Sequence, residues 1–177
     1  MKKSNAFKFT IISGIIVMVL GSLLHFVYNW TTNNQYVAAL SAVNESTWEH
    51  LKLLFYPMLL TTIIGYFAIG KEYSNFLFAR LLGILTSIAF TIVFFYTYSG
   101  IVGNNFVPID IGIFFVAVIL GEFVSCKVLN SNLKCNKYVS LSLLIALLIC
   151  FILFTYNAPR IGLFKDPLNG NYGISNK

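Results

Sequence analysis

The stretch that decides the fold is FTIISGIIVMVLGSLLHFVY, Phe9 to Tyr28, which contains no acidic or basic residue apart from one histidine. An α-helix rises about 1.5 Å per residue, so such a run is long enough to cross a hydrocarbon core about 30 Å thick. Similar apolar blocks follow at Leu51–Ile69, Phe76–Tyr98, Ile109–Val128 and Val139–Tyr156. The sequence therefore predicts an all-α integral membrane bundle of five transmembrane helices.

The composition excludes several classes of protein. The chain is 58% hydrophobic and 10% charged, whereas soluble domains carry about 25% charged residues. Three cysteines are too few for a disulfide-stapled secreted domain, and the net charge of +6 is scattered along the chain rather than clustered as in a nucleic-acid binder. The expected partners are membrane lipids and not nucleic acid, with a homo-oligomer or a partner membrane subunit as further candidates.

Basic residues predict the orientation, because they are retained on the cytoplasmic side of a membrane. With the N-terminus inside, the inner side holds Lys2, Lys3, Lys8, Lys71, Arg80, Lys127, Lys134 and Lys137. The outer side then holds only Lys52, Arg160, Lys165 and Lys177. We therefore expect an N-in, C-out topology, with residues 1–177 forming one domain. Proline and glycine in 157–177 predict an irregular external C-terminal tail.

Local patterns predict how the helices pack. Pro57 lies inside the second apolar block and leaves the carbonyl of Leu53 without its helical partner. In the fourth block Ala117, Gly121 and Ser125 repeat every four residues, and such a stripe allows close approach of two helices. In the first block Gly14, Gly21 and His25 share a face.

The densest ionisable run is NESTWEHLK, Asn44 to Lys52. Ser46 followed by Glu49 has the spacing of a capping box. If the helix begins at Asn44, Glu45 and Glu49 share one face, and His25 of the antiparallel neighbour meets them at the outer end. Carboxylates and imidazole are usual ligands of divalent metals, so His25, Glu45 and Glu49 form a candidate metal site. His50 points about 100° away from Glu49 and joins these three as a candidate catalytic residue.

Two other interpretations of this run remain open. The carboxylates could serve as general acid and base without a metal. Alternatively, Glu45 and Glu49 form a solvated first turn, favourably placed near the helix N-terminus, and His25 is an interface residue. The sequence has no HExxH motif and no glycine-rich phosphate loop that would decide between them.

Glu122 lies inside the fourth apolar block, where a carboxylate costs about 2.5–3.5 kcal/mol even on the mildest scale. It therefore needs a partner, and the candidates are Lys127, Arg80 or a proton on Glu122 itself. Its role is either that of a proton-relay or cation site or that of a neutral packing residue. We expect Glu122→Gln to be tolerated for folding and Glu122→Lys not to be, because an amide preserves hydrogen bonding whereas lysine adds charge and bulk where helices touch.

Three stretches carry a resemblance to a known family: Gly21–Trp30, Val43–Lys52 and Pro159–Pro167. With them the chain resembles an uncharacterised family of small bacterial multi-pass membrane proteins, known as a domain of unknown function. Its most particular piece is Asn-Glu-Ser-Thr-Trp-Glu-His. The resemblance implies a bacterial plasma membrane and about five helices, and it implies no activity or cofactor.

Two functions are compatible with these observations. The first is a membrane-embedded enzyme with an outer-face pocket of His25, Glu45, Glu49 and His50, with a divalent metal as its candidate cofactor, acting on a lipid or envelope precursor. The second is a non-catalytic binding or transport-accessory protein in which the same residues form a structural polar lock. Bound metal would favour the first function.

Overall fold

The computed structural model describes residues 2–174, and it contains five long helices within that range. They are α1 (Lys2–Trp30), α2 (Thr47–Ala68), α3 (Phe76–Val102), α4 (Val107–Leu129) and α5 (Lys137–Tyr156). Each is long and apolar enough to cross a membrane, so the predicted number of helices of that length and composition is confirmed. Several helices extend past the predicted apolar blocks; α1, for example, runs from Lys2 to Trp30 and α3 continues to Val102.

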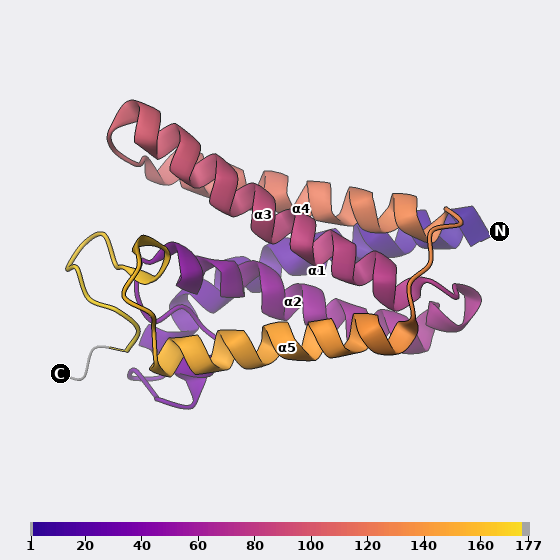
Figure 1. Cartoon of the computed structure of the whole chain (residues 1–177), viewed down its shortest axis with the longest axis horizontal. Coiled ribbons are helices and arrows are strands. Elements are labelled where there is room, and N and C mark those ends of the chain that lie inside the picture. The colour runs from indigo at the N-terminus through magenta and orange to yellow at the C-terminus, as the bar shows by residue number, and fades with distance from the viewer. Residues whose placement is uncertain (1, 175–177) are drawn as a thin grey trace.

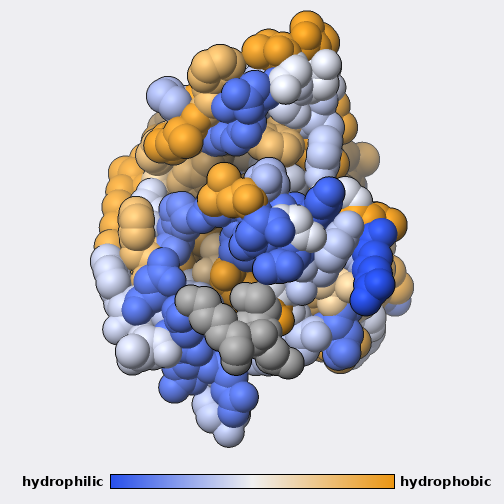
Figure 2. All heavy atoms as spheres, turned by 90° about the vertical axis from the view of Figure 1, so that its left-hand side faces the viewer, coloured by the Kyte–Doolittle hydropathy of each residue, from blue (hydrophilic) through white to orange (hydrophobic). Residues whose placement is uncertain are grey.

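The two ends of the bundle differ (Figure 1). One end, here called the loop-rich end, carries the 31–46 connection, the turn between α3 and α4, and the C-terminal segment 157–174. The opposite end carries the N-terminus and the short connections 69–75 and 130–136. Figure 2 views the loop-rich end, where hydrophilic residues gather across the centre and hydrophobic ones lie mainly around the margin.

Helix α2 is the most buried of the five, and α3 and α4 run side by side in Figure 1. The small residues of α4 make this pairing close, as their spacing predicts. A Cβ atom added at Gly121 would lie 2.0 Å from Ser87 Oγ and 2.7 Å from the Gly83 carbonyl oxygen. Ser125 Oγ of α4 donates to the Ala79 carbonyl of α3 at 3.1 Å, so the buried hydroxyl in this helix contact has a backbone partner on the neighbouring helix.

Pro57 has a structural consequence one turn earlier in α2. Because proline has no N–H, the carbonyl of Leu53 receives no helical hydrogen bond from position 57. Gly21 of α1 packs directly against this carbonyl: an added Cβ would lie 2.4 Å from the Leu53 oxygen and 2.7 Å from the Phe114 ring. The glycine face predicted for α1 therefore allows α1, α2 and α4 to meet beneath the loop-rich end.

The C-terminal segment is irregular, with a single short 3-10 turn at Gly162–Phe164, and it packs on the loop-rich end. Phe164 is buried with its ring centroid 4.7 Å from that of Trp48. Asn44 Nδ2 donates to the Gly173 carbonyl at 2.9 Å, which ties the segment to the entry of α2. Lys177, counted above among the outer basic residues, lies outside the described residues.

Candidate functional site

Helix α2 begins at Thr47 after the Ser46 cap, as the capping-box spacing predicted, and not at Asn44, the start on which the shared face of Glu45 and Glu49 depended. Ser46 is the N-cap, with an extended backbone and with its Oγ accepting from Glu49 N at 3.3 Å. Asn44 Oδ1 accepts from Ser46 N at 2.9 Å. Asn44 therefore stabilises the turn that precedes the helix and is not itself the N-cap. Glu45 therefore precedes the helix, and it does not stack on the same helical face as Glu49.

Three side chains from different segments meet at the loop-rich end: His25 of α1, Glu45 of the 31–46 connection and His50 of α2. One potential ligand atom from each lies within 4.8 Å of the others. His50 Nε2 lies 3.4 Å from Glu45 Oε2, and the two imidazole ring centroids lie 5.2 Å apart. The group is semi-buried, since 34% of the His50 side chain and 43% of the Glu45 side chain remain exposed.

Hydrogen bonding fixes the orientation of His50. Its Nδ1 lies 3.0 Å from the Ser46 carbonyl oxygen, which can only accept, so Nδ1 carries the hydrogen. The other ring nitrogen, Nε2, then faces the Glu45 carboxylate. A lone pair facing a carboxylate is repelled, so Nε2 must either hold a second proton or share a cation with Glu45. The arrangement is thus suited to a metal ion or to an imidazolium–carboxylate pair.

His25 contributes a second imidazole to the group. Its Nδ1 is buried, and no hydrogen-bond partner for it is found among the described residues. A buried polar atom without a partner carries a free-energy cost of about 1–3 kcal/mol, which a ligand could remove. His25 therefore supplies a third side chain able to bind a cation beside Glu45 and His50.

The structure places Glu49 elsewhere. Its carboxylate accepts from Lys52 Nζ at 2.6 Å and from Val43 N at 3.0 Å, and its side chain is almost completely buried. Lys52 Nζ also donates to the carbonyl oxygens of Ala38 and Ser41, at 2.8 and 3.2 Å. Through these hydrogen bonds the ion pair holds residues 38–43 against the start of α2. The predicted set of His25, Glu45 and Glu49 thus differs from the observed group, in which His50 lies where Glu49 was expected.

The His–Glu–His group lines a cavity of about 490 Å³ bounded by α1, α2, α3 and α4. Most of its wall is apolar, with Leu54, Phe95 and Phe114 among the lining residues. Asp110, near the start of α4, also lines it, and Pro167 and Leu168 of the C-terminal segment contribute to its edge. Such a mainly apolar cavity with a few polar groups is typical of a small-molecule site.

The local electrostatics favour an ionised carboxylate at position 45. The hydrogen bond from His50 lowers the pKa of Glu45, and the nearby charges of His50 and His25 lower it further, which together outweigh partial burial. Glu45 is therefore available as an anionic ligand at neutral pH.

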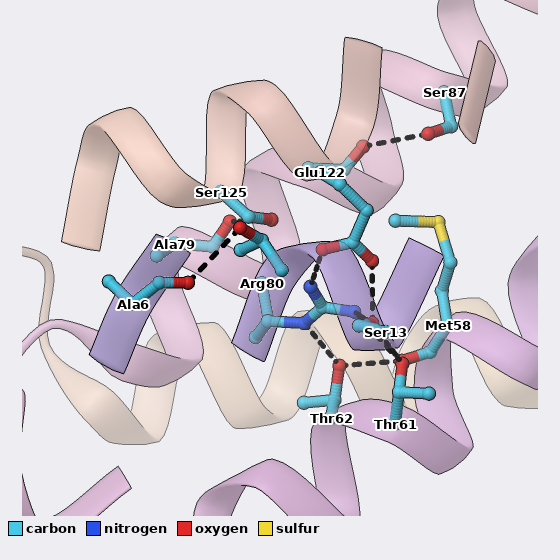
Figure 3. Close-up of polar contacts among 12 residues, drawn as sticks. Ala6, Ser13, Met58, Thr61, Thr62, Ala79, Arg80, Ser87, Glu122 and Ser125 are labelled. Carbon is cyan, nitrogen blue, oxygen red and sulfur yellow. Dashed lines mark hydrogen bonds and ion pairs between the residues drawn. The ribbon is translucent and has the colours of Figure 1, made fainter. Parts of the chain in front are cut away.

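Arg80 is the partner of Glu122, one of the three candidates named from the sequence. Arg80 Nη1 donates to Glu122 Oε2 at 2.6 Å, and both side chains are buried (Figure 3). Ser13 of α1 donates to Glu122 Oε1 at 2.7 Å. The guanidinium also donates to Ser13 Oγ of α1 and to three groups of α2, which are Thr61 Oγ1, Thr62 Oγ1 and the Met58 carbonyl. This network joins α1, α2, α3 and α4, and Figure 3 shows the carboxylate and guanidinium facing each other.

Sequence reasoning missed two features of this site. Asp110 was not among the predicted site residues, but it lines the same cavity as the histidines. The only available signal was its place at the outer end of a predicted span. The role of the Ser46 carbonyl in orienting His50 was also missed, although a carbonyl four residues before a histidine at a helix start is a recognisable arrangement.

Comparison with known proteins identifies the family and no activity. Neither the search of curated proteins nor the search of solved structures found a match. A family model described as a family of unknown function, DUF6512, matches residues 1–174. The protein therefore belongs to the DUF6512 family of unknown function.

Proposed function

We propose that the protein is a membrane-embedded enzyme that holds a divalent metal ion at His25, Glu45 and His50 and acts on a lipid or envelope precursor in the adjoining cavity. The observation that carries the proposal is the orientation of His50, whose Nε2 faces the Glu45 carboxylate while Nδ1 is held by Ser46. A metal ion between these atoms would take the place of the second His50 proton as the bridge to Glu45, and His25 adds a third ligand.

The donor set fits zinc best. Two imidazole nitrogens and one carboxylate oxygen are a common set for catalytic zinc, which keeps a fourth position open. Two ligands of a tetrahedral zinc ion, bonded at about 2.0–2.1 Å, lie about 3.4 Å apart. The three ligand atoms lie within 4.8 Å of one another, so side-chain rotations that move them about 1.4 Å closer would bring them into such a site. The hydrogen bond from His50 Nδ1 to Ser46 is the outer contact that normally orients a ligating histidine.

The chain's own residues define what chemistry the site supports. A divalent ion there would act as a Lewis acid toward a substrate carbonyl or phosphoryl group and would activate water. The apolar wall with Phe95 and Phe114 would hold a hydrocarbon chain and keep bulk water away from the polar group. Glu45, partly exposed at the cavity, would stay anionic and balance part of the ion's charge.

We propose that this site faces the outside of a bacterial plasma membrane. The cationic side chains of Lys8, Lys71, Lys127, Lys134 and Lys137 belong to the opposite end of the bundle. At the loop-rich end Lys52 is buried in its pair with Glu49, so its charge is not available to a membrane surface. This distribution favours a cytoplasmic opposite end and an external site.

The proposal is tested by the metal content of detergent-purified protein, measured by mass spectrometry after dialysis against zinc. The wild type should retain one zinc ion per chain. His25→Ala, Glu45→Gln and His50→Ala should each weaken zinc binding by at least about 100-fold. Glu72→Gln, an exposed carboxylate at the opposite end, is the matched control and should bind as the wild type does. Wild-type protein that takes up no zinc at micromolar concentrations would contradict the proposal.

The alternative is a non-catalytic binding or transport-accessory protein, acting as a homo-oligomer or with a partner membrane subunit. The ion pairs of the described residues favour it, since Glu45–His50, Glu49–Lys52 and Arg80–Glu122 each satisfy charges without a ligand. Under this alternative Glu45→Gln lowers the free energy of unfolding while zinc uptake is absent in the wild type and the variant alike.

A further inference from the structure

We infer that the cavity selects amphiphiles whose headgroup is uncharged or cationic and carries N–H or O–H donors, and that Asp110 makes this selection against phosphate headgroups. The inference deepens the proposed function, on which it rests for the statement that the bound amphiphile is a substrate. It narrows the lipid or envelope precursor to one headgroup chemistry.

Asp110 is held in place as a fixed acceptor. Tyr98 donates its hydroxyl hydrogen to Asp110 Oδ1, and Asn105 Nδ2 donates to Oδ2 at 2.8 Å. The tyrosine oxygen in turn accepts from Phe106 N at 3.1 Å, so the turn between α3 and α4 fixes the whole arrangement. A carboxylate can accept about four hydrogen bonds, so two fixed donors leave acceptor capacity for a ligand.

The cavity offers little for an anion to bind. Its acidic lining residues are Glu45 and Asp110; His25 and His50 also line it, with His50 already paired to Glu45, and no lysine or arginine from the described part of the chain lines it. Lys52, the cation nearest in sequence, is fully buried by Glu49 and two backbone carbonyls. A phosphate would meet two carboxylates in a partly dry space, where like charges repel more strongly than in water.

A metal ion does not reverse this preference. A divalent ion at His25, Glu45 and His50 would balance the charges of Glu45 and Asp110, so the lining as a whole would carry no net positive charge to attract a phosphate. The ion would then face a neutral group of the substrate, such as a carbonyl, while Asp110 accepts hydrogen bonds from an amine or hydroxyl. The cavity of about 490 Å³ with its largely apolar wall leaves room for a hydrocarbon chain beside that headgroup.

The test compares two probes with the same twelve-carbon chain, dodecylamine and dodecyl phosphate, on the full chain in a neutral maltoside detergent. Dissociation constants are measured with zinc and after chelation, and each is corrected for partition into empty micelles. Wild-type protein should bind the amine at least about tenfold more tightly than the phosphate, which corresponds to about 1.4 kcal/mol. Asp110→Asn should abolish this preference, and Glu72→Gln should retain it.

A second variant keeps the inference testable if Asp110→Asn does not fold. Asn105 is exposed and lines the cavity, so Asn105→Lys places a cation beside Asp110 without disturbing the core. It should reduce the amine preference as Asp110→Asn does, at an unchanged unfolding temperature. A wild type that binds the phosphate as tightly as the amine, or a preference that survives both substitutions, overturns the inference. Zinc binding with no such preference would leave the proposed function standing, whereas an Asp110-dependent preference without zinc uptake would refute only the metal site.

Discussion

The Arg80–Glu122 pair makes a strong prediction about stability. Glu122→Gln leaves the guanidinium of Arg80 buried, with no exposed surface and no counter-ion. Arginine cannot lose its charge, so the whole penalty of an uncompensated buried cation falls on the folded state. We expect the free energy of unfolding to fall by about 3–5 kcal/mol. This reverses the expectation from sequence alone that the neutral amide is tolerated, because the sequence left open whether Arg80, Lys127 or a proton neutralises Glu122, and the structure shows a fully buried Arg80.

Two further variants complete the cycle. Arg80→Met should cost less than Glu122→Gln, since a buried carboxylate can bind a proton and become neutral whereas the guanidinium cannot. Replacing both, as Arg80→Met with Glu122→Leu, should restore stability to within about 1 kcal/mol of the wild type or exceed it, because apolar residues of similar volume replace such pairs well.

The hydroxyl groups left behind in the double variant remain paired. Thr61 and Thr62 both donate to the Met58 carbonyl, at 3.1 and 2.7 Å. The assay is reversible unfolding in mixed maltoside–SDS micelles, followed by circular dichroism, with Glu72→Gln as the control. A loss below about 1 kcal/mol for Glu122→Gln, which is the range of an exposed ion pair, would refute the reasoning.

Three other predictions concern packing, topology and pH. Gly21→Ala should destabilise the protein by about 1–3 kcal/mol because the new methyl group overlaps a carbonyl of α2. Gly112→Ala has nothing within 4 Å of the new methyl group and should stabilise the protein by up to about 1 kcal/mol. Equal unfolding curves for the two variants would contradict this prediction. A topology reporter fused after Lys134 should read cytoplasmic and one after Asn104 external, and the reverse would exclude the proposed orientation. The pKa of Glu45 is lowered in the folded protein, so its stabilising contribution is present above the ordinary glutamate pKa and is lost as the pH falls through the lowered value. The stability difference between wild type and Glu45→Gln should therefore disappear in acid, and a difference that grows in acid would show the opposite sign.

Local features of the fold were predictable because their physics is local. An apolar run of sufficient length forms a spanning helix whatever its neighbours, and the Ser46 cap and the Ala117, Gly121 and Ser125 stripe depend only on short spacings. The Arg80–Glu122 pair was not predictable beyond a choice of candidates. Its residues lie 42 positions apart on different helices, and the sequence does not give the rotation of one helix against another.

The candidate site likewise combines features that the local sequence predicts with features that depend on the exact start of a helix. Sequence reasoning named His25, Glu45, Glu49 and His50, but a shared face for Glu45 and Glu49 required α2 to begin at Asn44 rather than after the Ser46 cap. One shift in the start of a helix moves Glu45 off the helical face and leaves Glu49 to pair with Lys52. Which carboxylate meets the histidines therefore depends on the cap, and the cap could be located only to within a few residues.

The central claim is that His25, Glu45 and His50 hold a metal ion, and X-ray absorption at the zinc K edge of purified, zinc-loaded protein tests it most directly. We predict a first shell of nitrogen and oxygen at about 2.0–2.1 Å, with the outer-shell scattering of two imidazole rings, and loss of one ring in His25→Ala or His50→Ala. A first shell with sulfur at about 2.3 Å, or the spectrum of hydrated zinc, would contradict the account.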